Sequence, residues 1–356
     1  MGVFVIAEAG VNHNGDLDMA RGLVDAAAVA GADAIKFQTF RADAVASGTA
    51  RKAVYQTKTT DPAESHVDLL KKLELPREWH QDLKRRAQDR GLVFMSTAFD
   101  RESLDFLVGD VEIDRIKIPS GELTNGPLLL AAARTGLPAI LSTGMANMDE
   151  IAQALGVLAF GYLGFETPAQ AAFEAAYASG DGKRRLADKV TLLHCTTEYP
   201  APFADIDLNA MGTLSAGFGL PVGLSDHSAG IAVPVAAAAL GAEVIEKHFT
   251  MDVTLPGPDH RASLEPADLS KMITSIREVE AALGKGLKEP KPSEQANMAV
   301  ARRSLVALQP VDAGDVFTEA NLGALRPGGG ISPMRYWEFL GTRAARSMNA
   351  GEALDE

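Results

Sequence analysis

Short apolar runs rich in Val, Ile and Phe recur along the chain, and each is followed by a longer stretch with the hydrophobic spacing of an amphipathic helix. Residues 18–30, 77–90, 149–159 and 269–283 are such helical stretches. Strands that alternate with helices indicate a parallel sheet. The predicted strands occupy residues 3–8, 34–38, 92–97, 114–118, 138–142, 190–195, 221–225 and 244–248.

Eight strand–helix units within about 280 residues match the size of a (β/α)₈ TIM barrel, which is an α/β fold. We therefore expect residues 1–283 to form a barrel that serves as the catalytic domain. A doubly wound open sheet is the alternative arrangement of the same elements. The first predicted strand is not followed by a G-x-G-x-x-G motif, so the sequence gives no support for a dinucleotide site there.

Three further segments interrupt or follow this alternation. Residues 41–73 form an insertion after the second predicted strand, and a loop of this length within a barrel is typical of a lid. Residues 284–297 begin with a run rich in Gly, Pro and Lys, which predicts a linker. Residues 298–356 predict a small loop-rich module with β-like runs at 304–308 and 316–318. A module of this size is marginal alone, so we expect it to dock on the barrel or on a second subunit.

Composition and charge narrow the class of protein. Apolar residues make up 46% of the chain and charged residues 23%, which is typical of a soluble globular enzyme. The net charge of −13 and the lack of a basic tract argue against a nucleic-acid partner. Cys195 is the only cysteine, so an intrachain disulfide is excluded. The N-terminus lacks a secretory signal and the longest apolar stretch, 231–242, is too short to span a bilayer, so we expect a cytoplasmic protein without a membrane partner.

Polar side chains gather at the ends of the predicted strands, where a parallel barrel collects its catalytic groups. Lys36 and Lys117, together with strand-end Ser and Thr hydroxyls, suit a phosphate or a carboxylate. His227 and His248 end two adjacent strands and suit a divalent metal that acts as a Lewis acid on a carbonyl. A single strand-end lysine or histidine is more often structural, and it is the pairing of each type that favours a site.

Seven short motifs carry a resemblance to a known family. They are AEAGVNHNG at 7–15, KFQ at 36–38, KIPSGE at 117–122, LSTGM at 141–145, HCTTEYP at 194–200, GLSDH at 223–227 and EKHFT at 246–250. In this order they resemble the sialic acid (nonulosonate) synthase family. The forms of these motifs look closest to the bacterial N-acetylneuraminate and N,N′-diacetyllegionaminate synthases. The C-terminal module, residues 298–356, resembles the family's SAF (antifreeze-like) β-clip domain.

The resemblance implies a transferase that condenses phosphoenolpyruvate with an N-acyl sugar. The sugar would be N-acetylmannosamine or 2,4-diacetamido-2,4,6-trideoxymannose. The products would be N-acetylneuraminate or N,N′-diacetyllegionaminate, and phosphate. The implied cofactor is a divalent metal, Mn²⁺ or Mg²⁺, held by His227 and His248. Another phosphoenolpyruvate-dependent aldol-type synthase and a non-catalytic carbohydrate-binding barrel remain as alternatives.

The resemblance also assigns roles to particular residues. Glu8, Lys36, Lys117 and Glu122 would be catalytic, with Glu8 or Glu122 handling a proton or positioning water. The residues implied to bind phosphoenolpyruvate are Lys36, Thr97, Lys117, Ser120, Ser142, Thr197 and Ser225. Those implied to bind the sugar are Gln38, Tyr199, Asp259 and Arg326. Some members have Asn at the position of Thr197, and a threonine hydroxyl offers one hydrogen-bond donor where an amide offers two. Arg326 would reach the partner subunit's site, which implies a domain-swapped homodimer.

Overall fold

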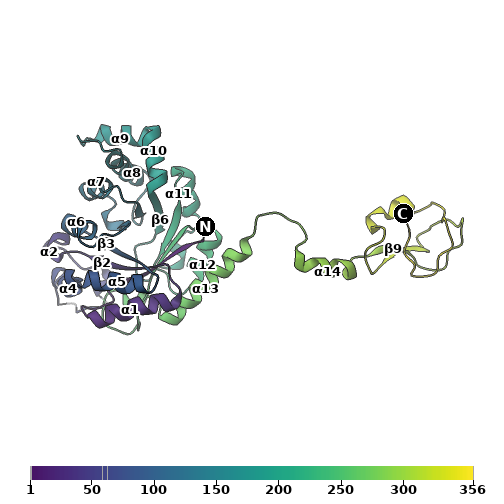
Figure 1. The fold of residues 1–356 in the computed structure, drawn as a ribbon, viewed down its shortest axis with the longest axis horizontal. Coiled ribbons are helices and arrows are strands. Elements are labelled where there is room, and N and C mark those ends of the chain that lie inside the picture. The colour runs from purple at the N-terminus through teal and green to yellow at the C-terminus, as the bar shows by residue number, and fades with distance from the viewer. Residues whose placement is uncertain (1, 58, 62, 356) are drawn as a thin grey trace. The chain divides into compact units, whose positions relative to one another are not determined.

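Eight parallel strands close into a barrel, which confirms the predicted (β/α)₈ fold (Figure 1). The computed structural model describes residues 2–57, 59–61 and 63–355. The strands are β1 (Phe4–Gly10), β2 (Ala34–Thr39), β3 (Val93–Ala98), β4 (Ile116–Ile118), β5 (Ala139–Ser142), β6 (Val190–Cys195), β7 (Val222–Asp226) and β8 (Val244–His248). They follow chain order around the barrel, and β8 pairs with β1 to close it. Each predicted strand agrees with these bounds to within two residues.

Both faces of the barrel sheet are packed with apolar side chains. Ile6, Met95, Ile140 and Leu193 are buried in one cluster on the inner face. A larger cluster, which includes Val5 and many other strand and helix residues, lies between the sheet and the helices. Because neighbouring residues of a strand point to opposite faces, a strand buried on both faces reads as a continuous apolar run. That is why the strands could be found from the sequence, and why polar residues at their ends stand out.

Helices surround the strands (Figure 1). They are α1 (Leu17–Ala30), α5 (His80–Asp89), α6 (Arg101–Gly109), α7 (Gly126–Arg134), α8 (Met148–Tyr162), α9 (Gln170–Ala178), α10 (Gly180–Lys189), α11 (Ala210–Phe218), α12 (Ala232–Ala239) and α13 (Pro266–Leu283). Short 3₁₀ turns are η1 (Arg77–Trp79), η2 (Ser120–Glu122), η3 (Phe203–Asp205) and η4 (His260–Ala262). Three helices, α8 to α10, separate β5 from β6, where simple alternation leads one to expect a single helix.

The predicted insertion contains three short helices after β2. These are α2 (Ala42–Val45), α3 (Val54–Thr57) and α4 (His66–Leu73). Two residues of the predicted insertion, Lys58 and Pro62, lie outside the described residues. Leu69 and Leu73 of α4 are buried against Val11 and Phe40 of the barrel, so this helix is anchored by an apolar cluster of its own.

The second compact unit of the chain is Lys285–Glu356, and the first is Met1–Gly284. The second unit contains α14 (Pro292–Ala301), the antiparallel strands β9 (Ser304–Ala307) and β10 (Leu322–Leu325), η5 (Pro333–Arg335) and α15 (Tyr336–Phe339). Helix α14 begins inside the predicted linker, residues 284–297. The β-like run predicted at 316–318 makes an isolated bridge between Val316 and Arg343 instead of a strand. Among the described residues, no helix has the length and apolar character needed to cross a membrane.

Candidate active site

A cavity of about 310 Å³ opens at the carboxyl ends of the barrel strands. Strand register explains why the site residues meet, because Glu8 lies beside Lys36 on one side and beside His248 on the other. Thr97 likewise lies between Gln38 and Lys117. The predicted site residues that line the cavity are Glu8, Lys36, Gln38, Thr97, Lys117, Ser120, Ser142, Thr197, Tyr199, Ser225, His227, His248 and Asp259.

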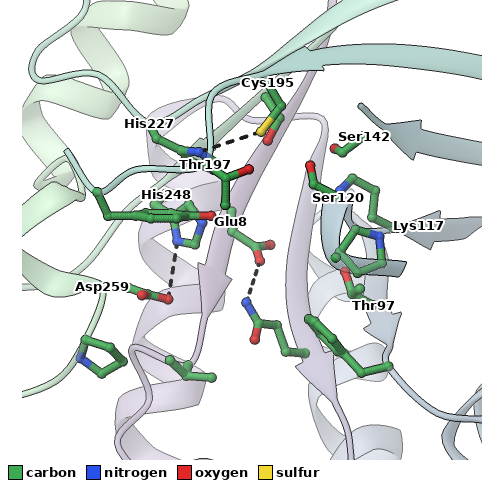
Figure 2. A pocket seen from close by; sticks show the side chains of 18 of the residues that line it. Glu8, Thr97, Lys117, Ser120, Ser142, Cys195, Thr197, His227, His248 and Asp259 are labelled. Atoms are coloured by element: carbon green, nitrogen blue, oxygen red, sulfur yellow. Dashed lines mark hydrogen bonds and ion pairs between the residues drawn. The ribbon is translucent and has the colours of Figure 1, made fainter. Parts of the chain in front are cut away.

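The cavity has two chemically distinct sides (Figure 2). Thr97, Lys117, Ser120 and Ser142 lie on one side. His227, His248 and Asp259 lie on the other side, and the carboxylate of Glu8 points between the two groups. The arrangement therefore offers cations and hydroxyls on one side and two imidazoles on the other, with a carboxylate between them.

Buried charges dominate the lysine side. Lys36 Nζ lies 2.7 Å from Glu8 Oε2 and 3.5 Å from Glu246 Oε2. Lys36 also donates a hydrogen bond of 2.9 Å to Thr97 Oγ1. Lys117 Nζ lies 3.4 Å from Glu246 Oε1, and the hydroxyl of Ser225 donates to the same oxygen at 2.9 Å. Two cations thus share two carboxylates in a place that is almost fully withdrawn from water.

The pKa values of the four groups respond differently to this burial. Burial raises the pKa of Glu8 to about 7, and the ion pair with Lys36 only partly opposes that rise. Burial would also raise the pKa of Glu246, but Lys117 and Lys36 outweigh it and lower that pKa to about 2. Burial lowers the pKa of Lys117, whereas for Lys36 the two carboxylates overcome burial and raise the pKa. A carboxyl group that titrates near neutrality beside a permanently charged one can take up and release a proton at pH 7.

Hydroxyl groups near Lys117 are poised to donate hydrogen bonds. Ser142 Oγ and Thr197 Oγ1 are buried and have no hydrogen-bond partner among the described residues. Ser120 Oγ accepts a hydrogen bond of 3.0 Å from the backbone N–H of Gly144. A Cβ atom on Gly144 would come within 2.8 Å of Ser120 Oγ and closer still to Thr197 Oγ1, so only glycine lets the backbone approach here. Buried donors without partners, next to lysines, suit an anionic ligand.

The histidine side has the donor chemistry of a metal site. The ring centroids of His227 and His248 lie 5.4 Å apart. His227 Nδ1 donates a hydrogen bond of 2.8 Å to the carbonyl of Thr196, which leaves the Nε2 lone pair of the neutral ring available. His248 Nδ1 is buried without a hydrogen-bond partner in the described part of the chain, and it lies 3.8 Å from Asp259 Oδ2. Tyr199 lies over His227 with ring centroids 4.0 Å apart.

The pKa values of the two imidazoles shift in opposite directions. Burial would lower the pKa of His227, but the nearby Cys195 outweighs burial and raises it. Burial, and to a lesser extent the nearby His227, lowers the pKa of His248 well below its usual value. Burial raises the pKa of Asp259 to about 6. Within the described residues, no group of three or more His, Cys, Asp and Glu side chains comes together as a metal site. The protein therefore offers two imidazole ligands, and any metal here would need water or substrate oxygens to complete its coordination.

One predicted site residue of the barrel lies outside the cavity lining, and another belongs to the second unit of the chain. Glu122 ends the η2 turn, outside the set of residues that line the cavity, and its Oε2 accepts a hydrogen bond of 2.6 Å from Asn125 Nδ2. Arg326 belongs to the second unit of the chain, where it is exposed and its Nε donates to the carbonyl of Ala301 at 2.9 Å. Of the two carboxyl groups, the structure thus places Glu8, and not Glu122, in the cavity lining.

Sequence reasoning gave no role to three polar residues that line the cavity. Glu246 lies two residues before His248 on β8, so strand alternation alone places both on the inner face. Gln56 and His66 come from the insertion, where no periodicity in the sequence indicated which residues turn inward. Strand alternation could therefore have predicted that Glu246 faces the cavity, whereas the positions of Gln56 and His66 could be seen only in the structure.

Comparison with known proteins gives consistent matches over nearly the whole chain. The profile of the NeuB family matches residues 23–288, and that of the SAF domain matches residues 302–356. The chain is 47% identical over 352 residues to the N,N′-diacetyllegionaminic acid synthase of Campylobacter jejuni, which covers 99% of this chain and 98% of that relative. It is 44% identical to the enzyme of the same name from Legionella pneumophila, over 99% of this chain and 94% of that relative.

A solved structure gives a similar result. The crystal structure of N-acetylneuraminic acid (sialic acid) synthetase from Leptospira borgpetersenii aligns with a TM-score of 0.66 at 36% sequence identity. The alignment covers 84% of this chain and 90% of that chain. These matches agree with the resemblance found from the seven motifs.

Proposed function

Because this chain belongs to the NeuB family, whose profile matches residues 23–288, we propose that it condenses phosphoenolpyruvate with an N-acyl mannosamine-type sugar. In this reaction C3 of phosphoenolpyruvate attacks the aldehyde carbon of the open-chain sugar, water adds at C2, and phosphate leaves by C–O cleavage. The product is a nine-carbon α-keto acid. The observation that carries the proposal is a single cavity with two buried lysines and unpartnered hydroxyls on one side and two histidines on the other.

Phosphoenolpyruvate binds on the lysine side in this proposal. Lys36 and Lys117 supply two buried positive charges for its phosphate and carboxylate. The hydroxyls of Ser142 and Thr197, which have no partner among the described residues, supply hydrogen bonds that become satisfied when the anion enters. Three further hydroxyls position groups around the anion: Thr97 accepts a hydrogen bond from Lys36, Ser120 accepts one from the Gly144 backbone, and Ser225 donates one to Glu246. Binding of this kind fixes the nucleophilic carbon near the aldehyde.

His227 and His248 hold a divalent metal, Mn²⁺ or Mg²⁺, in this proposal. When bound, such an ion supplies Lewis-acid polarisation of a carbonyl group. The free lone pair of His227 and the unpartnered Nδ1 of His248 fit that role. Asp259 and Tyr199, which lie against the histidines, are placed to contact the sugar, as is Gln38 through its position beside Glu8.

Glu8 handles the proton or positions the water in this proposal. Its carboxylate lies between the two sides of the cavity, and its pKa near 7 lets both protonation states form at neutral pH. Glu246 stays ionised and balances the charge of the two lysines. Of these two carboxylates, only Glu8 is suited to exchanging a proton.

The matches to legionaminic acid synthases favour 2,4-diacetamido-2,4,6-trideoxymannose as the sugar, and hence N,N′-diacetyllegionaminate as the product. The alternative sugar is N-acetylmannosamine, which would give N-acetylneuraminate. We also propose a homodimer in which Arg326 of the SAF domain contacts the N-acyl sugar. Arg326→Ala should then raise KM for the sugar more than KM for phosphoenolpyruvate, and sedimentation should give the mass of a dimer.

The direct test of the proposed function is phosphate release from phosphoenolpyruvate with Mn²⁺ present. Three reactions are compared, with N-acetylmannosamine, with 2,4-diacetamido-2,4,6-trideoxymannose and without sugar. We expect release only when a sugar is present, loss of release with a chelator, and a nine-carbon keto acid in stoichiometric amount. Release that depends on erythrose or arabinose phosphate instead would indicate another phosphoenolpyruvate-dependent synthase. Sugar binding without phosphate release would indicate a carbohydrate-binding protein.

A further inference from the structure

The insertion after β2 supplies one whole wall of the cavity. Its residues at the cavity differ in character from the strand-end residues, because most of them are apolar. They are Val45, Gln56, His66, Leu69, Leu70 and Leu73. The strand ends account for binding an anion and a metal, but they leave this wall without a role.

Helix α4, which carries most of this wall, is held firmly to the barrel. Leu69 and Leu73 are buried in a cluster with Val11 and Phe40. The carbonyl of Lys72 lies 3.0 Å from the place where a Cβ on Gly15 would stand, so the end of α4 packs directly on the loop after β1. Such a wall presents fixed side chains to a ligand, which is a requirement for discrimination between similar substrates.

Described residues before α4 are also held in place, through the buried side chain of Lys52. Lys52 Nζ donates to the carbonyl of Asp61 at 2.8 Å and lies 3.2 Å from Glu64 Oε2. Glu64 in turn pairs with Lys72 at 2.6 Å. The start of α4 is capped by Ser65, whose hydroxyl accepts from the backbone N–H of Asp68 at 3.1 Å. His66, the first residue of α4, therefore has a defined position.

His66 has a polar atom to offer a ligand. Its Nδ1 is buried and has no hydrogen-bond partner in the part of the chain that the structure describes. Burial and the charge of Lys52 lower its pKa, so the ring is neutral at pH 7 and has one nitrogen that donates and one that accepts. Leu70, one turn further along α4, lines the same cavity and is only half-buried, so its side chain is available to a ligand.

The two candidate sugars differ at C4 and C6, where N-acetylmannosamine carries hydroxyls. The diacetamido sugar carries an acetamido group at C4 and a methyl group at C6. Burying a methyl group against Leu70 removes apolar surface from water and so lowers the free energy of binding. A hydroxyl at the same place would lose its hydrogen bonds to water, which raises the free energy of binding. An acetamido group has one N–H and one carbonyl, either of which a neutral imidazole can partner.

We propose that His66 and Leu70 form the subsite that distinguishes sugars at C4 and C6, and that this subsite selects the 4-acetamido-6-deoxy sugar. His66 hydrogen-bonds to the C4 acetamido group, and Leu70 packs against the C6 methyl group. This inference rests on the proposed synthase function and adds to it the part of the protein that decides which product is made.

The test compares kcat/KM for the two sugars in three single variants. His66→Ala should lower kcat/KM for the diacetamido sugar roughly tenfold, through KM, and should leave N-acetylmannosamine almost unchanged. Leu70→Asn should lower the ratio of kcat/KM for the diacetamido sugar to kcat/KM for N-acetylmannosamine roughly tenfold. KM for phosphoenolpyruvate should stay the same in both. Lys71→Ala is the matched control, because Lys71 directly follows Leu70 on α4 but is exposed and outside the cavity lining.

The outcomes separate this inference from the function on which it rests. Equal losses with both sugars, or no change in the ratio, would overturn the subsite while the synthase function stands. A wild-type preference for N-acetylmannosamine would do the same. Phosphate release with neither sugar would overturn the proposed function and the subsite together. A far-UV circular dichroism melt of each variant checks that the substitution has not unfolded the barrel.

Discussion

Strand β8 carries two buried clusters of charge that lie on opposite faces of the same sheet. Glu246 faces the cavity with Lys36 and Lys117. Lys247, the next residue, faces the other way and pairs with Asp226 at 2.6 Å. Both side chains of that pair are almost completely buried. Adjacent strand residues point to opposite faces, so one short strand serves both clusters.

The two clusters differ in how completely their polar atoms are satisfied. Asp226 also accepts hydrogen bonds of 3.0 Å from the backbone N–H and the hydroxyl of Ser228, and Lys247 donates to the Ser228 carbonyl. Around the cavity, by contrast, Ser142, Thr197 and His248 each have a buried polar atom without a partner among the described residues. A satisfied network specifies structure, whereas unsatisfied groups beside a cavity are held ready for a ligand. We therefore assign the Lys247 cluster to stability and the cavity cluster to function.

The largest expected effect is on the histidine side of the cavity. His227→Ala and His248→Ala should each lower metal-dependent phosphate release by about 10³-fold or more, because each removes one of two imidazole ligands. Binding of Mn²⁺, measured by titration, should weaken in parallel, and the thermal melt should change little. Full activity in both variants would show that these histidines do not hold a catalytic metal.

Breaking the satisfied cluster should affect stability instead. Lys247→Met leaves Asp226 buried without its cation, which costs about 3–5 kcal/mol of unfolding free energy. The double variant Lys247→Met/Asp226→Leu should recover much of that loss, because no buried charge is then left unpaired. Urea unfolding of the two variants measures both values. A double variant no more stable than the single one would mean that the pair contributes more than charge balance.

Acid should destabilise the protein through histidines that are buried and neutral. Burial lowers the pKa of His80 to about 4. Between pH ~6.5 and ~4 the unfolded chain binds a proton at this position and the folded chain does not, so stability falls as the pH falls. The loss from His80 alone is roughly 3 kcal/mol. Urea unfolding at pH 7 and pH 4.5 should show it, and His80→Gln should reduce the difference between the two pH values.

The smallest effect is expected for an exposed ion pair on a helix. Arg101 and Asp105 are 2.8 Å apart on α6, and both side chains are more than half exposed. Asp105→Asn should change the unfolding free energy by less than about 0.5 kcal/mol, because water screens the pair. A loss comparable to that of Lys247→Met would mean that burial is not what separates strong from weak pairs in this protein.

Much of the site could be predicted because it depends on strands. Most strands begin as an apolar run, and the first polar residues, such as Lys36 and Lys117, mark the cavity. Glu122 shows where this argument ends, since the chain turns at η2 and the side chain bonds to Asn125 outside the cavity lining. The wall formed by His66 and Leu70 could not be predicted either, because the orientation of an irregular insertion depends on packing that has no sequence period.

The second unit was predicted less well than the barrel. The run at 316–318 has β-forming residues, yet β10 forms at Leu322–Leu325, where the chain pairs with β9. Strand propensity in a small loop-rich unit is weak compared with the pairing that tertiary contacts impose. The predicted linker, residues 284–297, is also partly helical, because α14 begins at Pro292. Proline is well tolerated at the first position of a helix, so it does not mark a linker here.

Lys117→Met, which is matched to Lys247→Met, tests most directly the assignment of the cavity cluster to function and of the Lys247 cluster to stability. Lys117 is buried like Lys247, but it faces the cavity, and its partner Glu246 also pairs with a second cation, Lys36. We predict that Lys117→Met lowers sugar-dependent phosphate release by about 10³-fold, while the unfolding free energy falls much less than in Lys247→Met because Lys36 still pairs with Glu246. A loss of several kcal/mol in unfolding free energy, with activity retained, would contradict the assignment of the cavity cluster to function.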